Sequence, residues 1–394
     1  MPSPALRIAI VSTPKSWGGG EQLAWTVGNG LAALGHSVTW VTRCNSVLHE
    51  RLGAAGKDCL TVRGKYPSIP ELISIRQTLS ERGIETIYGN DSQAINWTGL
   101  IGAGLRGVSK IGVKHTVFPI KSPLKYNWFL DRVLCVSNAS RRVCIDGGIR
   151  SDLTQTVYGG LELQSYDRAA ERLYVAESLG ISPETTLYVA VGSLLECKGY
   201  DTLIDAAAIL RAKGQRFMIA VCGEGNQRES LQSQIDYRRL QDSVRLVGFQ
   251  QDPYRWIAAS DALLHPSRSE GLSLVTIAAQ LLNVPVVATE VGGLREVMYS
   301  PETEQPLGWV VPTDSPSQLA KAIYGLQSNR LASSNYVVEA QRWANRRFLA
   351  SHMIDGVVRL IRDSARQDPS STNNSRSIKS WADVLPSTLP VVGR

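Results

Sequence analysis

The sequence predicts an α/β protein built from two Rossmann-like domains, each with its own parallel sheet. Three observations support this. The 394 residues exceed the roughly 250–300 at which a single core stops growing. Short β-branched runs alternate with helix-length amphipathic stretches, and the alternation starts afresh near residue 184. The apolar share of 43% and the charged share of 20% are those of a soluble globular chain.

The first half contains the first series of predicted strands. Each is short and rich in Val, Ile or Tyr, and helical spacing separates it from the next. They cover residues 7–11, 37–42, 84–88, 110–115, 132–137 and 155–160. Strands alternating with helices form parallel sheets through right-handed crossovers, so residues 1–165 are expected to be the first domain.

The second half repeats the pattern and then changes. Its predicted strands cover residues 186–192, 217–223, 243–248, 261–267, 284–289 and 308–312, with helical stretches at 203–210 and 319–326. We expect residues 166–333 to be the second domain, joined to the first by the polar segment 161–183. Residues 334–366 are helical in pattern, and residues 367–394, rich in Ser, Pro and Asn, predict a flexible tail.

The charge is unevenly distributed. Residues 1–165 contain 18 Lys and Arg against 11 Asp and Glu, which accounts for the whole net charge of +7. The excess is densest in residues 106–150. A solvated face explains it, and so does attraction to an anionic membrane or an acidic acceptor. No base-reading motif accompanies it, so nucleic acid is not an expected partner.

Neither a membrane span nor a signal peptide is evident. No apolar run approaches the roughly 18 residues that a span needs, and the opening residues are typical of a strand. We expect a cytoplasmic protein, with peripheral contact at the inner membrane face through residues 106–150 as an alternative. The six cysteines are scattered without a C-x-x-C pair, which favours buried free thiols over a metal or redox role.

Ligands of open α/β sheets bind beyond the carboxyl ends of the strands, so the loops there are candidate sites. Gly18, Gly19 and Gly20 precede a predicted helix whose free amides favour an anion. A nicotinamide site would need G-x-G-x-x-G and an acidic residue after the second strand, but Arg43 and Cys44 stand there. This disfavours a dehydrogenase.

Two loops of the second domain have anion-binding features. Lys198 and Gly199 stand at a predicted helix start, where a lysine opposes the macrodipole by a few tenths of a kcal/mol unless an anion binds between them. Gly223, Glu224 and Gly225 follow the next strand. For Glu224, a structural turn and a ligand loop remain open alternatives.

The run SRSEGLSLVTIAAQ, residues 267–280, places Glu270 where a loop becomes an apolar helix. Glu270 is therefore a candidate either for capping that helix or for chemistry.

An ordered series of motifs surrounds Glu270. On the basis of these motifs, residues 6–330 resemble the retaining GT-B glycosyltransferases of family four, also called group 1. The matching elements are Gly18-Gly19-Gly20-Glu21, residues 35–38 (GHSV), Lys114-His115, Val136-Ser137, Pro266-Ser267, Glu270-Gly271, residues 284–288 (VPVVA) and residues 292–296 (GGLRE).

The resemblance implies a fold and a reaction. Two Rossmann-like domains would face each other across a cleft, and a sugar would pass from a nucleotide diphosphate sugar to a polysaccharide, glycolipid or metabolite acceptor. Transfer would retain the anomeric configuration and need no cofactor. No Asp-x-Asp occurs, so no metal site is expected.

The resemblance also assigns roles to residues. Glu270 would bind donor sugar hydroxyls, and the amides of Gly271, Leu272 and Ser273 would face the diphosphate. Lys198 would neutralise the leaving phosphate, Gly19 and Gly20 would close over the donor, and His115 would sit near the transferred sugar. Amides and a cation ease the departure of phosphate by stabilising its growing charge.

Two positions depart from the family pattern. Ala278 stands where the family has a second Glu that holds the nucleotide ribose, and Ser193 stands where it has an Arg. Hydrogen bonds to charged groups are each worth roughly 1.5–3 kcal/mol, so their loss weakens an ordinary donor site. Arg268, Thr276 and Gln280 are candidates for replacement contacts.

Two alternatives follow. The departures at Ala278 and Ser193 suggest a degenerate transferase kept as a binding or scaffold protein. The second alternative is a sugar-nucleotide epimerase on the same architecture. It is disfavoured because the Glu-Gly and Gly-Gly-x-x-Glu runs follow the arrangement found in the transferases.

Overall fold

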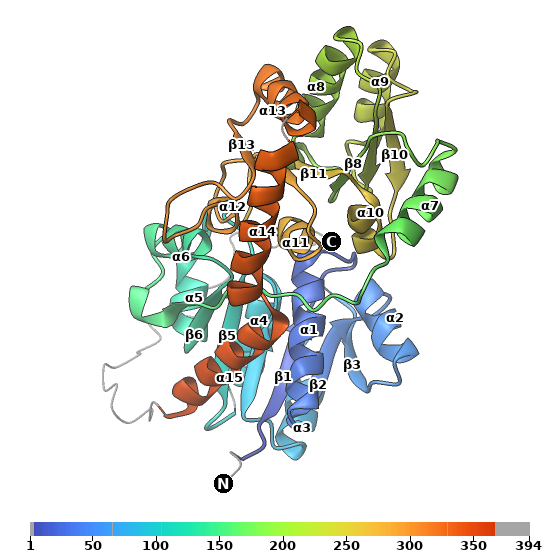
Figure 1. The fold of residues 1–394 in the computed structure, drawn as a ribbon. Helices are drawn as coiled ribbons and strands as arrows, with labels where there is room; N and C mark the ends of the chain where they lie inside the picture. The colour runs from blue at the N-terminus through green and yellow to red at the C-terminus, as the bar shows by residue number, and fades with distance from the viewer. Residues whose placement is uncertain (1–3, 65, 104, 329, 367–394) are drawn as a thin grey trace.

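A computed structural model describes residues 4–64, 66–103, 105–328 and 330–366. It contains two parallel sheets, each covered by helices on both faces (Figure 1). The predicted fold class is therefore confirmed. The predicted tail, residues 367–394, lies outside the described residues.

Within the described residues, the first sheet has the strand order β3-β2-β1-β4-β5-β6-β7. Its strands are β1 (Arg7–Ser12), β2 (Ser37–Arg43), β3 (Cys59–Val62), β4 (Thr86–Gly89), β5 (Ser109–Lys114), β6 (Arg132–Cys135) and β7 (Thr154–Thr156). Its helices are α1 (Gly19–Ala33), α2 (Val47–Ala54), α3 (Ile69–Glu81), α4 (Ala94–Gly102), α5 (Pro123–Phe129) and α6 (Asn138–Asp146). Six of these strands match predicted ones, whereas β3 was not predicted.

The second sheet has the order β10-β9-β8-β11-β12-β13 over the same described part. Its strands are β8 (Leu187–Val191), β9 (Met218–Cys222), β10 (Val244–Gly248), β11 (Ala262–His265), β12 (Val286–Thr289) and β13 (Trp309–Val311). Its helices are α8 (Tyr200–Ala212), α9 (Arg228–Tyr237), α10 (Pro253–Ala259), α11 (Leu274–Leu281), α12 (Leu294–Met298) and α13 (Pro316–Ser328). All six strands match predicted ones.

The segment 161–183, predicted as a polar linker, contains a helix. This is α7 (Arg168–Leu179), which Asp167 caps by accepting from the amides of Ala169 and Ala170. Its Val175, Ala176 and Leu179 are buried, and it packs on α10. The few apolar residues of this polar segment therefore fall on one helix face.

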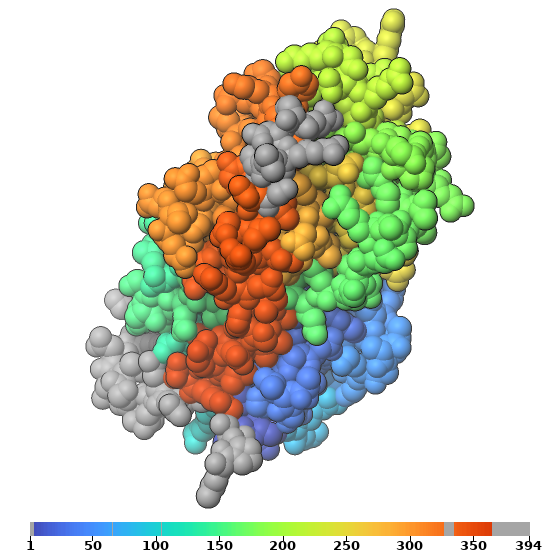
Figure 2. All heavy atoms as spheres, in the orientation of Figure 1, coloured from blue at the N-terminus to red at the C-terminus, as the bar shows by residue number. Residues whose placement is uncertain are grey.

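The chain crosses between the two halves twice, and the crossings are hydrogen bonded to each other. The Leu161 amide donates to the Phe348 carbonyl at 2.9 Å, and the Ala350 amide donates to the Leu161 carbonyl at 2.9 Å. Helix α14 (Arg330–Arg347) packs on α11, and α15 (Ala350–Arg366) returns to pack on α1 and β5. On the face seen in Figure 2, these red helices run across the junction of the two halves.

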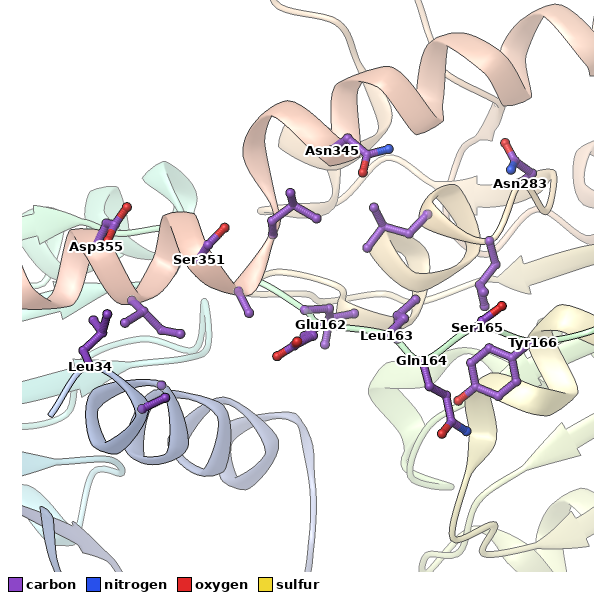
Figure 3. A pocket seen from close by; sticks show the side chains of 18 residues that line it. Leu34, Glu162, Leu163, Gln164, Ser165, Tyr166, Asn283, Asn345, Ser351 and Asp355 are labelled. Carbon is purple, nitrogen blue, oxygen red and sulfur yellow. The ribbon is translucent and has the colours of Figure 1, made fainter.

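A cavity of about 810 Å³ lies beside these crossings (Figure 3). The C-terminal ends of α1 and α11 line it through Leu34 and Asn283, and the crossing segments contribute Glu162, Tyr166 and Asn345. None of the predicted site residues lines it. Both α1 and α11 therefore run from the candidate site, at their N-termini, to the crossings, at their C-termini.

Candidate functional site

Lys198 is held by the loop that follows β8. Residues Glu196–Lys198 form a short 3-10 turn, and Gly199 then takes a left-handed conformation (φ 65°) at the start of α8. A Cβ at Gly199 would clash with the Pro266 carbonyl oxygen. The lysine loop and the loop after β11 are thus in backbone contact, which brings Lys198 to Glu270.

The Glu270 carboxylate is the centre of a buried polar cluster. Its Oε1 accepts from Lys198 Nζ at 2.6 Å and from Ser267 Oγ at 2.8 Å, and it lies 2.9 Å from His265 Nε2. The Glu270 side chain is only 9% exposed, and that of Lys198 is 21% exposed. Two of the predicted site residues, Lys198 and Glu270, therefore come together although they are 72 residues apart in the chain.

These contacts set the ionisation of Glu270. Burial alone would raise its pKa, but the charges and hydrogen bonds of Lys198 and His265 outweigh burial and lower the pKa to about 2. The carboxylate is therefore ionised throughout the neutral range, where it can only accept hydrogen bonds. A sugar hydroxyl is a suitable donor for it.

Glu270 does not cap the following helix. The N-cap of α11 is Ser273, whose side chain accepts from the Thr276 amide at 3.3 Å. The capping interpretation of Glu270 is wrong for a geometric reason. Glu270 lies three residues before the N-cap, and its carboxylate contacts Lys198 and His265. Gly271, Leu272 and Ser273 are all buried at this helix start.

The first half meets this cluster through His115 and the glycine loop. A Cβ at Gly271 would clash with the His115 carbonyl oxygen, and one at Gly20 would lie 3.4 Å from the His115 ring. Gly19 lies next to Leu274, with 3.6 Å between its added Cβ and Leu274 Cδ1. The loops predicted to face each other thus lie in direct contact.

The glycine loop differs from the prediction in one respect. Gly19 and Gly20 form the first turn of α1 rather than preceding it, and Gly18 is the N-cap. The adjacent Glu21 is buried, and burial together with the charge of Asp91 raises its pKa to about 7 against opposing hydrogen bonds from the amides of Glu21 and Gly18.

Ser193, Gly223 and Glu224 lie in the loops after β8 and β9. Gly223 has φ 152°, and an added Cβ would clash with the Gly192 carbonyl oxygen, so the two loops pack backbone against backbone. Ser193 is exposed. The Glu224 carboxylate pairs with Arg228 at 2.9 Å.

The candidate replacement residues are engaged inside the second half. Arg268 binds both carboxylate oxygens of Asp201, at 2.9 and 2.6 Å, and its Nε donates to Asp314 at 2.6 Å. Thr276 Oγ1 bonds to Ser273 Oγ at 2.9 Å, and Gln280 Nε2 donates to the Val297 carbonyl at 3.0 Å. Ala278 is completely buried.

Two features of the site were not predicted. His265 and Ser267 hold the Glu270 carboxylate; the signal available was a His and a Ser at a strand end just before Glu-Gly. Asn90, which follows β4, bonds to His115 at 2.9 Å, and no local motif marked it.

Glu296 makes an unpredicted contact between the two halves. Its carboxylate accepts from the amides of Asn138 and Ala139, the first residues of α6, at 2.9 and 2.7 Å. Tyr158 also donates its hydroxyl to Glu296, at 2.6 Å. Glu296, the last residue of the Gly-Gly-x-x-Glu run, therefore links the second half to the N-terminus of α6 in the first half.

Among the residues that the structure describes, no three His, Cys, Asp or Glu side chains are grouped so that they could hold a metal ion. None of the described helices has the length and apolarity that a bilayer crossing requires.

Comparison with curated proteins finds partial relatives. A D-inositol 3-phosphate glycosyltransferase of Jonesia denitrificans is 29% identical over 40% of this chain and 38% of its own. An alpha-D-kanosaminyltransferase of Streptomyces kanamyceticus is 27% identical over 41% of each chain. A D-inositol 3-phosphate glycosyltransferase 2 of Catenulispora acidiphila is 32% identical over 48% of this chain and 46% of its own. The chain thus spans less than half the length of these curated relatives.

Solved structures match over nearly the whole chain. HepE of Anabaena, in complex with UDP and glucose, has a TM-score of 0.78 at 20% identity, covering 91% of this chain and 99% of its own. A glycosyltransferase from Rickettsia africae has a TM-score of 0.80 at 16% identity, covering 93% and 100%. At these identities the likeness concerns the fold.

Two family models match successive parts of the chain. The model described as Glycosyltransferase Family 4 matches residues 17–165, which include the glycine loop and His115. The model described as Glycosyl transferases group 1 matches residues 175–343, which include Lys198, Glu270 and Glu296. Together with the two-sheet architecture, these matches show that the chain belongs to the group 1 glycosyltransferases of the GT-B fold.

Proposed function

We propose that this protein transfers a sugar from a nucleotide diphosphate sugar to a hydroxyl acceptor, with retention at the anomeric carbon and without a metal ion. The observation that carries the proposal is the pair formed by Lys198 and Glu270, with 2.6 Å between Nζ and Oε1. It lies directly before the N-terminus of α11. A cation, a sugar-binding carboxylate and a helix start are thereby grouped at one place.

In this proposal the second half binds the donor. The ionised Glu270 accepts hydrogen bonds from hydroxyls of the donor sugar, while the amides of Gly271, Leu272 and Ser273 face the diphosphate. Lys198 already touches Glu270 and can reach an adjacent phosphate oxygen. It therefore neutralises the charge that grows on the departing group.

The first half completes the site. Gly19 and Gly20 cover the donor, and their lack of side chains allows close approach. His115 lies against Gly20 and, through its carbonyl, against Gly271, and this closeness to both loops supports a role beside the sugar. Because the two loops are in contact, the halves must separate for the donor to enter.

The reaction exchanges one bond at the anomeric carbon for another. The bond from that carbon to the diphosphate oxygen breaks, and the acceptor oxygen bonds to the same carbon. The proton of the acceptor hydroxyl leaves with the nucleotide diphosphate. Lys198 and the amides of Gly271, Leu272 and Ser273 stabilise that leaving group.

A donor screen tests the proposal. HepE, a neighbour in fold, has been solved with UDP-glucose, which makes UDP-glucose the first donor to try, followed by other UDP-, GDP- and ADP-sugars. We expect one donor to release its nucleotide in an acceptor-dependent manner. Analysis of the product's anomeric configuration tests retention, and unchanged rates after chelation test independence from metal.

A matched pair of variants links the activity to the site. Glu270→Gln removes the charge that pairs with Lys198, so we expect transfer to fall at least 100-fold. Glu229→Gln changes an exposed carboxyl on α9 of the same half and should leave transfer unchanged. Full activity of Glu270→Gln would refute the assignment.

The second candidate is a degenerate transferase that binds without transferring. It rests on Ala278, which is fully buried and has no group for a ribose, and on Ser193, which carries no charge for a phosphate. Calorimetry with UDP, GDP, ADP and their sugars separates the candidates. Submillimolar binding accompanied by turnover supports the enzyme, whereas binding without turnover, or no binding, supports the scaffold.

The basic segment 106–150 supports a further element of the proposal, contact with an anionic membrane or acceptor. Arg106, Lys121, Arg142 and Arg150 are exposed, whereas Lys114 is buried. Exposed apolar side chains accompany them: Phe118, Leu124 and Trp128, at 51, 53 and 42% exposure. Leu124 and Trp128 are four residues apart on α5 and so share a face.

Vesicle sedimentation tests this contact. We expect binding to vesicles that contain phosphatidylserine, loss of binding at high salt, and no binding to neutral vesicles. The double variant Leu124→Ser/Trp128→Ser should weaken the binding. Equal recovery with both kinds of vesicle, or with neither, would remove membrane contact from the proposal.

A further inference from the structure

Asn90 links three segments of the first half at the candidate site. It follows β4 and is fully buried. Its Nδ2 lies 3.2 Å from the Gly20 carbonyl oxygen and 3.3 Å from Ser12 Oγ, and its Oδ1 lies 2.9 Å from His115 Nε2. One amide side chain therefore touches the glycine loop, the end of β1 and the histidine.

The Gly20 contact fixes which way the Asn90 amide points. A backbone carbonyl oxygen can only accept a hydrogen bond, so the NH₂ group of Asn90 must face it. The carbonyl oxygen Oδ1 then faces His115. Because Oδ1 can only accept, Nε2 of His115 must carry a hydrogen.

The rest of the imidazole follows from its neutrality. Burial lowers the pKa of His115 to about 4, and the smaller effects of the Asn90 hydrogen bond and of Asp91, which raise it, and of Lys114, which lowers it, do not alter that direction. A neutral imidazole carries one hydrogen. With that hydrogen on Nε2, Nδ1 is an acceptor, and it is buried without a partner among the described residues.

The opposite arrangement is disfavoured. If Asn90 were turned over, its Oδ1 would face the Gly20 carbonyl, oxygen against oxygen. Nδ1 of His115 would then carry a hydrogen with no acceptor, and an unsatisfied buried donor is costly.

We infer that Asn90 is a positioning residue: it holds His115 as the Nε2–H tautomer, so that Nδ1 is free to accept a hydrogen bond from a hydroxyl of the sugar being transferred. This inference rests on the proposed function. The site supports it because the His115 ring lies against Gly20 while its carbonyl lies against Gly271, between the two loops that would enclose the donor.

Nitrogen NMR of ¹⁵N-histidine-labelled protein tests the tautomer without any activity. The chain has five histidines, and a His115→Gln variant assigns the signal. At neutral pH we expect a protonated, pyrrole-like Nε2 and an unprotonated, pyridine-like Nδ1. Asn90→Ala should mix the two tautomers, whereas Asn90→Asp should keep Nε2–H, because a carboxylate also accepts from it.

Transfer kinetics test the consequence. Asn90→Ala should lower kcat about tenfold, the value of one ordinary hydrogen bond. Ser12→Ala is the matched control, because it removes the other buried contact of Asn90 Nδ2 and leaves Oδ1 on His115. It should retain the wild-type tautomer and rate.

The inference is overturned by an unprotonated Nε2 in the wild type, by an unchanged tautomer in Asn90→Ala, or by equal rates in Asn90→Ala and Ser12→Ala. Should the wild type transfer no sugar from any donor, the proposed function fails, and the NMR result alone decides whether Asn90 sets the tautomer.

Discussion

Two glutamates at the candidate site, Glu21 and Glu270, have the same burial and opposite ionisation. Each lies near a helix start, one in each half, and each is 8% exposed when backbone and side chain are taken together. Burial is the largest influence on both, yet the pKa of Glu21 rises to about 7 whereas that of Glu270 falls to about 2. The difference lies in their neighbours, since Glu270 has Lys198 and His265 while Glu21 has Asp91.

These shifts make opposite contributions to stability. The distance of each pKa from the ordinary value of 4.5 corresponds to about 3 kcal/mol. The depressed pKa of Glu270 stabilises the fold above pH 4.5, and this contribution is lost as the pH falls towards 2. The raised pKa of Glu21 has the reverse effect and destabilises the fold. This destabilisation is absent below pH 4.5, grows as the pH rises, and is complete above pH 7.

Removing the cation from the Glu270 cluster should have the largest effect. Lys198→Met leaves a buried carboxylate with a weaker set of partners, so we expect a loss of about 4 kcal/mol in the free energy of unfolding at pH 7. Urea denaturation measures it. Transfer should fall at least 100-fold.

A second variant checks the cause. Adding Glu270→Gln to Lys198→Met removes the uncompensated charge and should restore most of the stability but none of the transfer. The control Lys321→Met, on an exposed lysine, should change neither. Equal instability of the single and double variants would mean that packing, rather than charge, holds this cluster.

Neutralising the Glu21 carboxylate should instead increase the free energy of unfolding. Glu21→Gln mimics the protonated side chain, so we expect a gain of up to about 3 kcal/mol at pH 8. The gain should shrink as the pH falls from 7 and vanish below 4.5. Denaturation across this pH range measures it, and a gain independent of pH would contradict a raised pKa.

The sequence was sufficient for the repeating strand and helix pattern but not for every element. The predicted strands of both halves were correct because their β-branched runs are continuous and well separated. β3 was missed because CLTV is short and follows a polar turn. Helix α7 was missed because its buried Val175, Ala176 and Leu179 are few within a charged segment.

For the site, local motifs marked residues that lie on glycine-rich loops, such as Lys198 and Glu270. They did not mark residues that act through distant partners. Asn90 and His115 are 25 residues apart, and Glu296 reaches Ala139 across 157 residues. The first pair depends on the pairing of β4 with β5 in one sheet, and the second on how the two sheets are placed together. No local spacing encodes either.

Glu296 extends the comparison to a carboxylate that joins the two halves. It caps α6 together with the local Ser137, whose side chain accepts from the Ser140 amide. Glu296→Gln should therefore weaken this contact by about 1 kcal/mol, the usual worth of a cap. We expect hydrogen exchange at the Asn138 and Ala139 amides to quicken several-fold. Glu304→Gln, at an exposed position, is the control, and unchanged exchange at both amides would mean that Glu296 does not hold the halves together.

Glu224 should show the smallest effect, because solvent already surrounds it. Its side chain is 50% exposed and its partner Arg228 is 43% exposed, and such pairs contribute less than about 1 kcal/mol. We expect Glu224→Gln to change the free energy of unfolding by less than about 0.5 kcal/mol.

Stability therefore cannot distinguish a structural turn from a ligand loop, but donor affinity can. If Glu224 binds the donor, Glu224→Gln raises the Kd for the nucleotide while Arg228→Gln, which frees the carboxylate, does not. If both variants leave the Kd unchanged, the loop after β9 is a turn whose glycines serve only to pack it against Gly192 and Leu194.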